Sequence, residues 1–410
     1  MKNVTILGGG LAGSEAALQL FKHGFHVQLI DAKPSNLQEL YSQPSYGELI
    51  CSNSLGGIHD RSPKALLIDE LRTLGSAMIS IGDACRIEDK YYYAVDKERF
   101  SGAVTKMILE SGVECISEYA SEIPTDDWVI VATGASTNPQ LMKQLSDLFG
   151  INNYYFADAS CPIVDIRTVD MEDNGIKKLS NDLYAVILNE EVKNRFYQAL
   201  LFYNENRQLP KDTLTSAYNK NETIEGCASL GIEILEDEKL SSDYLIGTPH
   251  ILLRREKAMN SGFILDRCTT TLRNSEQKAL FAMLPGLRDC KYFKFGRMHP
   301  NTFINSPETL DCHFRIKGTN TFIAGQLSGV DDYAPAIASG WIAAAKIIYG
   351  EKLAPLPRET MIGALAHYVS NEAVTEFKPA GPSFALLSES EGDAFHVSRV
   401  AIQKYLSALT

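Results

Sequence analysis

Three closely spaced glycines near the amino terminus have the residue type and spacing of an anion-binding turn. Gly8, Gly10 and Gly13 follow an apolar run at 4–7 and open a segment rich in Ala, Leu and Gln. Glycines spaced in this way let backbone N–H groups approach a pyrophosphate at the N-terminus of a helix, where the helix dipole favours anions. Asp31, at the end of the next apolar run, can accept hydrogen bonds from a ribose hydroxyl. The pattern predicts a dinucleotide site, with a tight turn that binds nothing as the alternative.

Such a site must be positioned by parallel strands, and the sequence contains the elements to do so. The first strand, a helix over 14–23 and a second strand at 27–30 make a complete strand–helix–strand unit. Two further strands are expected at 128–134 and 321–325, each closed by a glycine. The late strand ends in a turn of small residues and precedes an Ala-rich helix, which is typical of flavoproteins. FAD is therefore the favoured nucleotide, and NADH or NADPH is expected only as a passing reductant.

The middle of the chain differs in character from both ends. It combines a helical stretch at 190–206 with short strands and turn clusters, as an inserted domain would. We therefore predict an α/β protein of the GR2 flavoprotein type, a Rossmann-like FAD-binding domain with an inserted α+β domain. The first part of the FAD-binding domain is expected at 1–154, the inserted substrate domain at 155–295, and the second part with C-terminal helices at 296–410.

The amino-acid composition of the chain excludes several classes of protein. The 410-residue chain is 45% hydrophobic and 22% charged, which is ordinary for a globular protein. Its net charge of −12 excludes a uniformly basic nucleic-acid binder but leaves room for a local basic patch. The eight cysteines contain no CxxC pair, so a zinc ribbon is excluded and no metal site is expected. No apolar run reaches the roughly 18 residues of a membrane span, and we expect no secretory leader before the first strand. We therefore expect a cytoplasmic protein without a membrane partner.

Several strings along the chain resemble one enzyme family. They are GGGLAGSEAA at 8–17, CSNSLGG at 51–57, EGC at 225–227, MHPNTFINSP at 298–307 and AGQLSGV at 324–330. In this order they are similar to the folate/FAD-dependent tRNA (uracil-5-)-methyltransferases, the TrmFO family of the MnmG/TrmFO superfamily, from residue 4 to about 345. Together with the glycine motif, the resemblance assigns cofactor binding to Gly8, Gly10, Leu11, Ala12, Gly13, Asp31, Asn53, Ser54, Thr133, Gly134, Gly325, Gln326, Gly329 and Val330.

The resemblance also implies a reaction. In this family a one-carbon unit passes from 5,10-methylenetetrahydrofolate through flavin N5 to C5 of an RNA uracil, and reduced flavin supplies the hydride. The family's two functional cysteines correspond to Cys51, which assists proton removal at C5, and Cys227, the nucleophile toward C6. Uracil C5 becomes nucleophilic only after a thiolate adds to C6, so the chemistry needs a reactive thiol. Cys51 follows a strand-like run at 48–50, and Cys227 lies in a polar stretch where we expect exposure. A buried inert thiol is the alternative for each.

A basic segment offers a surface for RNA in this otherwise acidic chain. Residues 254–297 contain ten basic and four acidic residues, with aromatic residues at 292, 293 and 295. Phosphate contact combined with base stacking is the functional interpretation, and a solvated charged face is the alternative. The expected RNA contacts are Arg254, Arg255, Arg273, Lys291 and Lys294.

The departures from the family lie on the substrate side. Ala228-Ser229-Leu230-Gly231 stand where the family has a Pro-Ile-Glu run, and the connection at 247–250 is short. The family's Asn-Cys-Pro is absent around 184–187, and Asp331-Asp332-Tyr333 stand where the family favours Glu-Gly-Tyr. A tRNA T-loop uridine is the substrate that the resemblance implies, and a divergent paralogue acting on a 23S rRNA uridine is one alternative. A flavoprotein oxidoreductase or a flavin-holding paralogue that lost RNA methylation is the other. The oligomeric state is left open.

Overall fold

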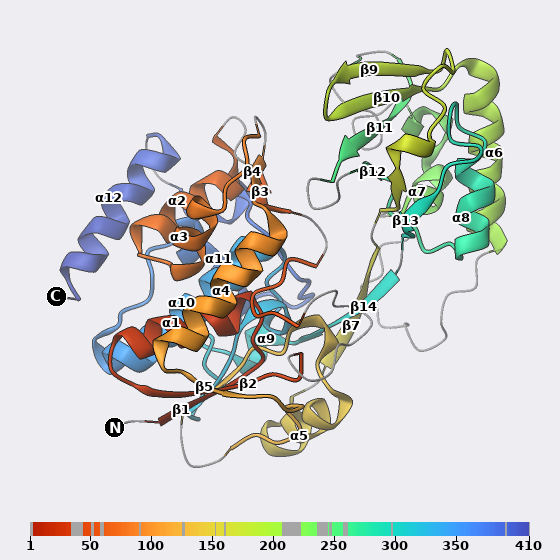
Figure 1. Ribbon diagram of the computed structural model, residues 1–410. Coiled ribbons are helices and arrows are strands. Elements are labelled where there is room, and N and C mark those ends of the chain that lie inside the picture. Colours follow the sequence, from red (N-terminus) through yellow and green to blue (C-terminus); the bar gives the residue numbers. More distant parts are fainter. Residues whose placement is uncertain are drawn as a thin grey trace. The chain divides into compact units, whose positions relative to one another are not determined.

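The computed structural model describes most of the chain. The described residues are 3–33, 44–50, 53–57, 61–89, 92–124, 128–151, 153–159, 161–206, 223–235, 245, 248–256, 261–296, 298–389 and 392–409. The chain forms two compact units, a first unit of residues 1–154 and 301–410 and a second unit of residues 155–300 (Figure 1).

The first unit begins with alternating strands and helices and ends in helices. Its elements are β1 (Asn3–Leu7), α1 (Leu11–Lys22), β2 (His26–Ile30), β3 (Ser54–Gly57), α2 (Pro63–Thr73), α3 (Ala77–Ala84), β4 (Tyr92–Ala94), α4 (Lys97–Ser111), β5 (Glu114–Ile116), β6 (Trp128–Val131), η2 (Gly134–Ser136), α5 (Pro139–Phe149), α9 (Ser306–Thr309), β15 (Thr321–Ile323), η8 (Gly325–Ser328), α10 (Tyr333–Tyr349), η9 (Gly350–Lys352), α11 (Met361–Ser370), η10 (Phe384–Leu386) and α12 (Ala394–Ser407).

A five-stranded parallel sheet organises the first unit. Its strand order is β15-β6-β1-β2-β5, and every pairing is parallel. Leu7 at the end of β1 is in register with Ile30 of β2 and Val131 of β6, and Val131 with Ile323 of β15. The carboxyl ends of four strands therefore meet at one edge of the sheet. The expected strands at 128–134 and 321–325 end early, because a 3₁₀ turn begins at Gly134 and another at Gly325.

Helix α1 is buried along most of its length and contacts β1, β2, α3, α4 and α10. A Cβ atom on Gly340 of α10 would lie 2.2 Å from the carbonyl oxygen of Ala12, so α1 and α10 pack with their backbones close together. Glu15 of α1 is fully buried, and its carboxylate accepts hydrogen bonds from Ser76 Oγ at 2.8 Å and from the N–H of Met78 at 2.9 Å. Burial raises the pKa of Glu15, and these donors partly oppose the rise. The contacts fix α1 against the start of α3.

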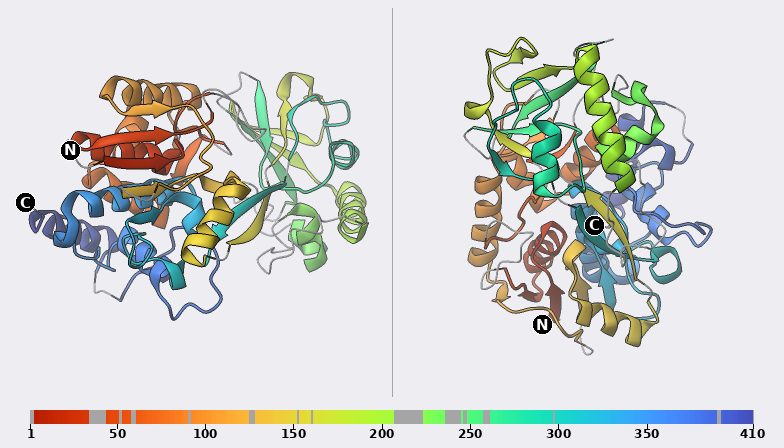
Figure 2. Two further views of the ribbon diagram at one scale, coloured as in Figure 1. Left: turned by 90° about the horizontal axis from the view of Figure 1, so that it is seen from below. Right: turned by 90° about the vertical axis from the view of Figure 1, so that its right-hand side faces the viewer.

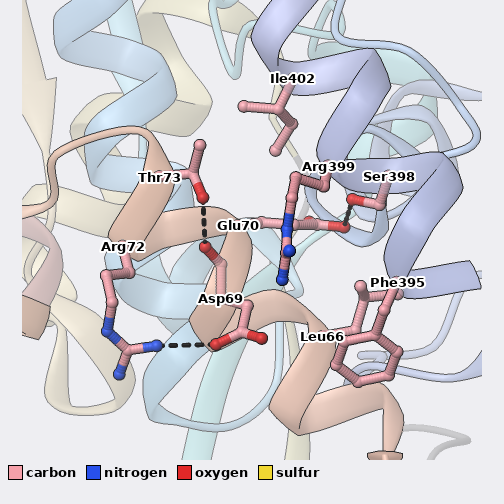
Figure 3. A pocket seen from close by; sticks show the side chains of 9 residues that line it. All are labelled: Leu66, Asp69, Glu70, Arg72, Thr73, Phe395, Ser398, Arg399 and Ile402. Atoms are coloured by element: carbon pink, nitrogen blue, oxygen red, sulfur yellow. Dashed lines mark hydrogen bonds and ion pairs between the residues drawn. The ribbon is translucent and has the colours of Figure 1, made fainter.

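A second buried carboxylate joins the C-terminal helices to α2. Glu70 accepts hydrogen bonds from the N–H groups of Met361 and Ile362, each at 2.7 Å, and from Ser398 Oγ at 2.6 Å. Burial raises the pKa of Glu70 to about 7. Beside it, α2 and α12 border a small groove of about 220 Å³, and Phe395 and Arg399 line its α12 side (Figure 3).

The second unit is built on an antiparallel sheet. Its elements are β7 (Asn153–Ala159), β8 (Ile163–Asp165), η3 (Ile166–Thr168), β9 (Ile176–Ser180), β10 (Leu183–Ile187), α6 (Glu190–Asn206), α7 (Ile224–Cys227), η5 (Ala228–Leu230), η6 (Ile232–Leu235), β11 (His250–Arg255), β12 (Gly262–Leu265), α8 (Asn274–Phe281) and β13 (Tyr292–Lys294). The strand order is β13-β8-β12-β11-β10-β9. Helices α6 and α8 lie against the same face of this sheet, as both views show (Figures 1 and 2), and Phe196 and Phe281 of these helices join its core.

Strand β7 contains the point where the chain passes from the first unit into the second, and it pairs with β14 (Met298–Ile304), which contains the point of return. In the parts of the chain that the structure describes, no helix is long and apolar enough to cross a membrane.

Candidate functional site

The loops that follow four parallel strands form one edge of the first unit. We call this the glycine edge, and it comprises residues 8–13, 31, 132–134 and 324–326. The N–H of Gly8 donates to the carbonyl of Ile30 at 2.8 Å, and a Cβ on Gly8 would lie 2.5 Å from the carbonyl oxygen of Ala132. A Cβ on Gly325 would lie 3.3 Å from Cβ of Ala12. The structure therefore brings together the cofactor candidates that the sequence places after β1, β2, β6 and β15.

The backbone angles and surroundings of Gly10 show whether this edge of the sheet can accommodate a phosphate group. Its φ of −73° and ψ of −165° are open to any residue, so the backbone does not require glycine there. Apart from Gly10 itself and its two chain neighbours, no described atom lies within 4 Å of the place that a Cβ on Gly10 would take, so packing does not require glycine either. At Gly13, by contrast, a Cβ would lie 1.8 Å from the carbonyl oxygen of Gly8. Gly10 thus leaves an open cradle at the start of α1, where the first N–H groups of a helix lack intrahelical acceptors. The residues present fit a dinucleotide pyrophosphate.

Asp31 holds the glycine loop in place. Its Oδ2 accepts a hydrogen bond from the N–H of Gly9 at 2.5 Å, and its Oδ1 accepts one from the N–H of Lys33 at 2.8 Å. Both carboxylate oxygens therefore have acceptor capacity left for a hydroxyl donor, since each carries two lone pairs. The ribose contact of Asp31 stays a prediction.

Two residues beside the glycine loop escaped the sequence analysis. Tyr46 is 3% exposed, and a Cβ on Gly9 would lie 2.4 Å from its ring, while the N–H of Gly47 donates to the carbonyl of Gly9 at 2.9 Å. The Lys33 side chain is also buried; burial lowers the pKa of Lys33, and the charges of Asp31 and Glu48 partly oppose this. The sequence signal that could have identified Lys33 as a neighbour of the site is its position two residues after Asp31, whose carboxylate accepts its N–H.

The CSNSLGG string lies partly within the described chain. Cys51 is outside the described residues, so its predicted role stays a prediction. Asn53 is buried, and its carbonyl accepts the N–H of Val95 at 2.8 Å, while Ser54 Oγ donates to the carbonyl of Gly56 at 2.9 Å. β3, which begins at Ser54, contacts α10. The strand-like interpretation of 48–50 is wrong, since these residues are irregular. The N–H of Gly47, directly before them, donates to the carbonyl of Gly9 in the glycine loop.

The loop before α10 contains a strained residue. Asp332 has φ 87° and ψ 165°, a conformation that is essentially restricted to glycine and costs about 1–3 kcal/mol in other residues. Its Oδ1 accepts the N–H of Tyr333 at 2.8 Å, and its Oδ2 lies 2.5 Å from Nζ of Lys64. An exposed ion pair typically stabilises a protein by only about 0–1 kcal/mol. Asp332 lies two residues beyond Val330, so the strain occurs next to candidate cofactor residues.

Cys227 is not exposed as the sequence predicted. It ends the one-turn helix α7, is 6% exposed, and belongs to the apolar core that α6 shares with the antiparallel sheet. The polar neighbours that suggested exposure are used internally, since Thr223 Oγ1 accepts the N–H of Gly226 at 3.1 Å and Ser229 Oγ donates to its carbonyl at 2.7 Å. The exposure prediction for Cys227 is therefore wrong.

A buried carboxylate anchors α7. Glu225 accepts hydrogen bonds from Thr270 Oγ1 at 2.9 Å, from Thr271 Oγ1 at 2.7 Å and from the N–H of Thr271 at 2.9 Å. The N–H of Ile224 donates to the carbonyl of Thr269 at 2.8 Å. The EGC string therefore encodes a fixed position for the thiol as well as the thiol itself. The run of three threonines at 269–271 is the sequence signal that could have identified this anchor.

The five expected RNA contacts differ in their place in the fold and in their ion pairing. Arg254 and Arg255 lie on β11, inside the sheet, and pair with Asp266 at 3.2 Å and Asp182 at 3.0 Å. Arg273 is exposed and pairs with Glu276 at 3.4 Å. Lys291 and Lys294 lie at edge strand β13 and form no ion pair among the described residues.

The aromatic residues near these lysines divide into two groups. Tyr292 and Phe295 stack on each other with ring centroids 4.6 Å apart. Phe293 is 47% exposed and therefore available for stacking. Among the described residues, no group of three or more His, Cys, Asp or Glu side chains is placed to hold a metal ion.

Comparisons with known proteins show which family and which solved structures this chain is similar to. The family model described as glucose inhibited division protein A, GidA, matches residues 3–350. Proteins of Streptococcus gordonii and Lactobacillus gasseri, both named methylenetetrahydrofolate--tRNA-(uracil-5-)-methyltransferase TrmFO, are 32% and 33% identical to this chain. The alignments cover 95% and 94% of this chain and 93% and 92% of those proteins. A solved structure of Aquifex aeolicus GidA matches 100% of this chain and 74% of its own with a TM-score of 0.74 at 16% identity, which identifies a shared fold.

Proposed function

The chain belongs to the GidA family and to the TrmFO methyltransferases, and we propose that it is a flavoprotein that methylates C5 of a uracil in tRNA. Methylenetetrahydrofolate is the one-carbon donor named for its relatives. FAD, when bound, supplies the carrier for the one-carbon unit and the hydride that completes the methyl group. The observation that supports the proposal most is at the glycine edge. Neither packing nor backbone conformation requires a glycine at position 10, and its lack of a side chain leaves an open cradle for a phosphate.

The residues that would hold FAD come from four loops of the first unit. The N–H groups of Gly10, Leu11, Ala12 and Gly13 would donate to the pyrophosphate, and the positive end of the α1 dipole would favour its charge. Asp31 would accept a hydrogen bond from the ribose, as expected at the end of β2. The other residues that would contact FAD are Gly8, Asn53, Ser54, Thr133, Gly134, Gly325, Gln326, Gly329 and Val330.

The two cysteines would perform the chemistry on the base. The thiolate of Cys227 would add to C6 of uracil, and the electron pair of the C5–C6 double bond would move to give an enolate that is nucleophilic at C5. Once the carbon is joined to C5, Cys51 as a thiolate would accept the proton from C5, and the bond between this carbon and its carrier would break. Addition of a hydride to the carbon would then expel the Cys227 thiolate from C6 and restore the C5–C6 double bond. Since Cys227 is 6% exposed, a base reaches its thiol only when the packing around α7 opens.

RNA contact would fall mainly on Lys291 and Lys294 at β13, with exposed Phe293 for stacking and Arg273 nearby in sequence. These lysines are free of carboxylate partners among the described residues, so they can neutralise phosphates. Arg254 and Arg255 would contribute less, since Asp266 and Asp182 already balance their charge. NADH or NADPH would act as the reductant.

Methyl transfer can be measured directly. The purified protein is incubated with methylenetetrahydrofolate, NADPH or NADH, and tRNA from cells that lack 5-methyluridine in tRNA. Nucleoside mass spectrometry should then detect 5-methyluridine in the tRNA. A product found only when ribosomal RNA is supplied would transfer the proposal to that RNA, and no product with either RNA would overturn it.

A second function is favoured by one observation, the burial of Cys227 in an apolar core. A flavoprotein that oxidises NAD(P)H and reduces a small molecule would need no exposed thiol. NAD(P)H oxidation that continues at an unchanged rate in a Cys227→Ala variant, with no methylated RNA from the wild type, would select this function.

A further inference from the structure

One ion pair joins two segments that both contain candidate cofactor residues. Lys64 extends from the first turn of α2, and its Nζ lies 2.5 Å from Oδ2 of Asp332, which caps α10. Lys64 also packs against β3, since a Cβ on Gly56 would lie 3.3 Å from Cβ of Lys64. The pair therefore links β3, with Asn53 directly before it, to the loop at 329–332.

The loop at 329–332 is held on its other side by the backbone. The N–H of Asp331 donates to the carbonyl of Ala380 at 2.9 Å, and the N–H of Ala380 donates to the carbonyl of Gly329 at 3.0 Å. A Cβ on Gly329 would lie 2.4 Å from the ring of Phe377, so the loop has little room on that side. The Lys64–Asp332 ion pair is thus a side-chain contact that ties this loop to α2.

Stability alone does not explain Asp332. Its backbone occupies the region that suits glycine, and the side chains of Lys64 and Asp332 are 45% and 25% exposed. An ion pair with this much solvent contact usually stabilises a fold by less than such strain costs. Strain of this kind persists chiefly at functional sites, where it holds a group in a required position.

We propose that Lys64 and Asp332 are positioning residues that clamp β3 to the loop at 329–332 and thereby shape the cofactor site. The proposal rests on the proposed function in one respect, that Asn53, Ser54, Gly329 and Val330 contact FAD. The clamp acts through these residues, and neither Lys64 nor Asp332 takes part in the chemistry.

The clamp is tested by FAD affinity and by stability, with no folate or RNA present. The variants are Lys64→Met, Asp332→Asn, Asp332→Gly and the double variant Lys64→Met/Asp332→Gly. Asp332→Gly relieves the strain, so the unfolding temperature of the flavin-free protein should equal or exceed that of the wild type. Its FAD dissociation constant should nevertheless rise about tenfold, because the site is less preorganised.

The pattern across the variants decides the proposal. Lys64→Met and Asp332→Asn should weaken FAD binding as much as Asp332→Gly, and the double variant should be no weaker, because all four break one contact. A dissociation constant within about twofold of the wild type in the single variants, or losses that multiply in the double variant, would overturn the clamp. Asp332→Asn keeps a side-chain oxygen for the N–H of Tyr333, so it removes the charge with the cap retained.

A matched control comes from a second ion pair in the first unit. Lys317 is 40% exposed and its Nζ lies 2.5 Å from Oε1 of Glu372, as close as in the clamp. Lys317→Met should leave FAD affinity unchanged, and an equal loss there would also overturn a specific clamp. Wild-type protein that binds no FAD would overturn the clamp and the flavin function together. Methyl transfer that fails while FAD binding follows the predicted pattern would overturn only the methyltransferase function.

Discussion

The glycine edge and the Cys227 region use different chemical groups, and this difference decides whether each site can be predicted from the sequence. At the glycine edge the working groups are backbone N–H donors, which strand, turn and helix place by their own geometry. At Cys227 the working group is one sulfur atom, and its use depends on what packs over it. The glycine edge has an open cradle at Gly10, whereas Cys227 is 6% exposed within an apolar core. Backbone sites follow from local pattern, and side-chain sites follow from packing.

The largest expected effect concerns the buried thiol of Cys227. Cys227→Ala should abolish methyl transfer to RNA, because no other group then adds to uracil C6. FAD affinity should stay within about twofold of the wild type, since the substitution lies in the second unit. Nucleoside mass spectrometry and flavin fluorescence titration measure the two quantities. Methylated RNA from the variant would exclude Cys227 as the nucleophile.

The next largest effect concerns the open cradle at Gly10. Gly10→Ala should fold normally, because neither the backbone angles nor any described neighbour excludes a Cβ there. FAD affinity should fall about 100-fold, since the methyl group occupies the place of the phosphate and a loss near 2.7 kcal/mol corresponds to that factor. Flavin fluorescence titration and circular dichroism report binding and folding. Unchanged affinity would show that the cradle does not hold the pyrophosphate.

Gly13→Ala provides the comparison for Gly10. A Cβ at this position meets the carbonyl oxygen of Gly8 at 1.8 Å, so the variant should lose stability as well as flavin. Equal stability of the two variants would contradict the distinction between a glycine that packing requires and one that a ligand requires.

A smaller effect concerns the contact of α2 with the C-terminal helices α11 and α12. Burial raises the pKa of Glu70 to about 7 from an ordinary value of 4.5, so the folded state binds this proton more tightly than the unfolded chain. The contribution of Glu70 to stability should therefore fall as pH rises from about 4.5 to 7, by up to about 3 kcal/mol. Urea unfolding between pH 5 and 8 should show this fall in the wild type relative to Glu70→Gln. Parallel pH profiles of the two proteins would contradict the raised pKa.

The smallest effect would separate free from paired basic residues in the second unit. Lys291→Ala/Lys294→Ala should weaken RNA binding about fivefold at 0.1 M salt and lower the salt dependence by about two phosphate contacts. Arg254→Ala/Arg255→Ala is the control, and it should change binding less than about twofold because both arginines are already paired. Filter binding at several salt concentrations measures both. A larger loss in the arginine variant would assign the RNA surface to β11.

The predicted α/β fold is confirmed, and particular residues explain why. The apolar runs at 4–7, 27–30 and 128–131 become neighbouring parallel strands because each is flanked by a glycine turn or a helix-forming segment. The helix expected at 190–206 occurs with those bounds. The predicted ends of the short strands were less accurate, and the strand-like run at 48–50 is irregular in the structure.

Local sequence patterns were sufficient to predict the parallel strands, the glycine turn and the acidic residue after β2, because these depend on periodicity and on the small size of glycine. The burial of Cys227, the ion pairing of Arg254 and Arg255 and the contact of Lys64 with a strained Asp332 became known from the packed fold. Burial and ion pairing depend on residues far apart in the chain, such as Lys64 and Asp332, and no local pattern encodes which of them will meet. A side chain's availability for chemistry is therefore a property of the packed fold.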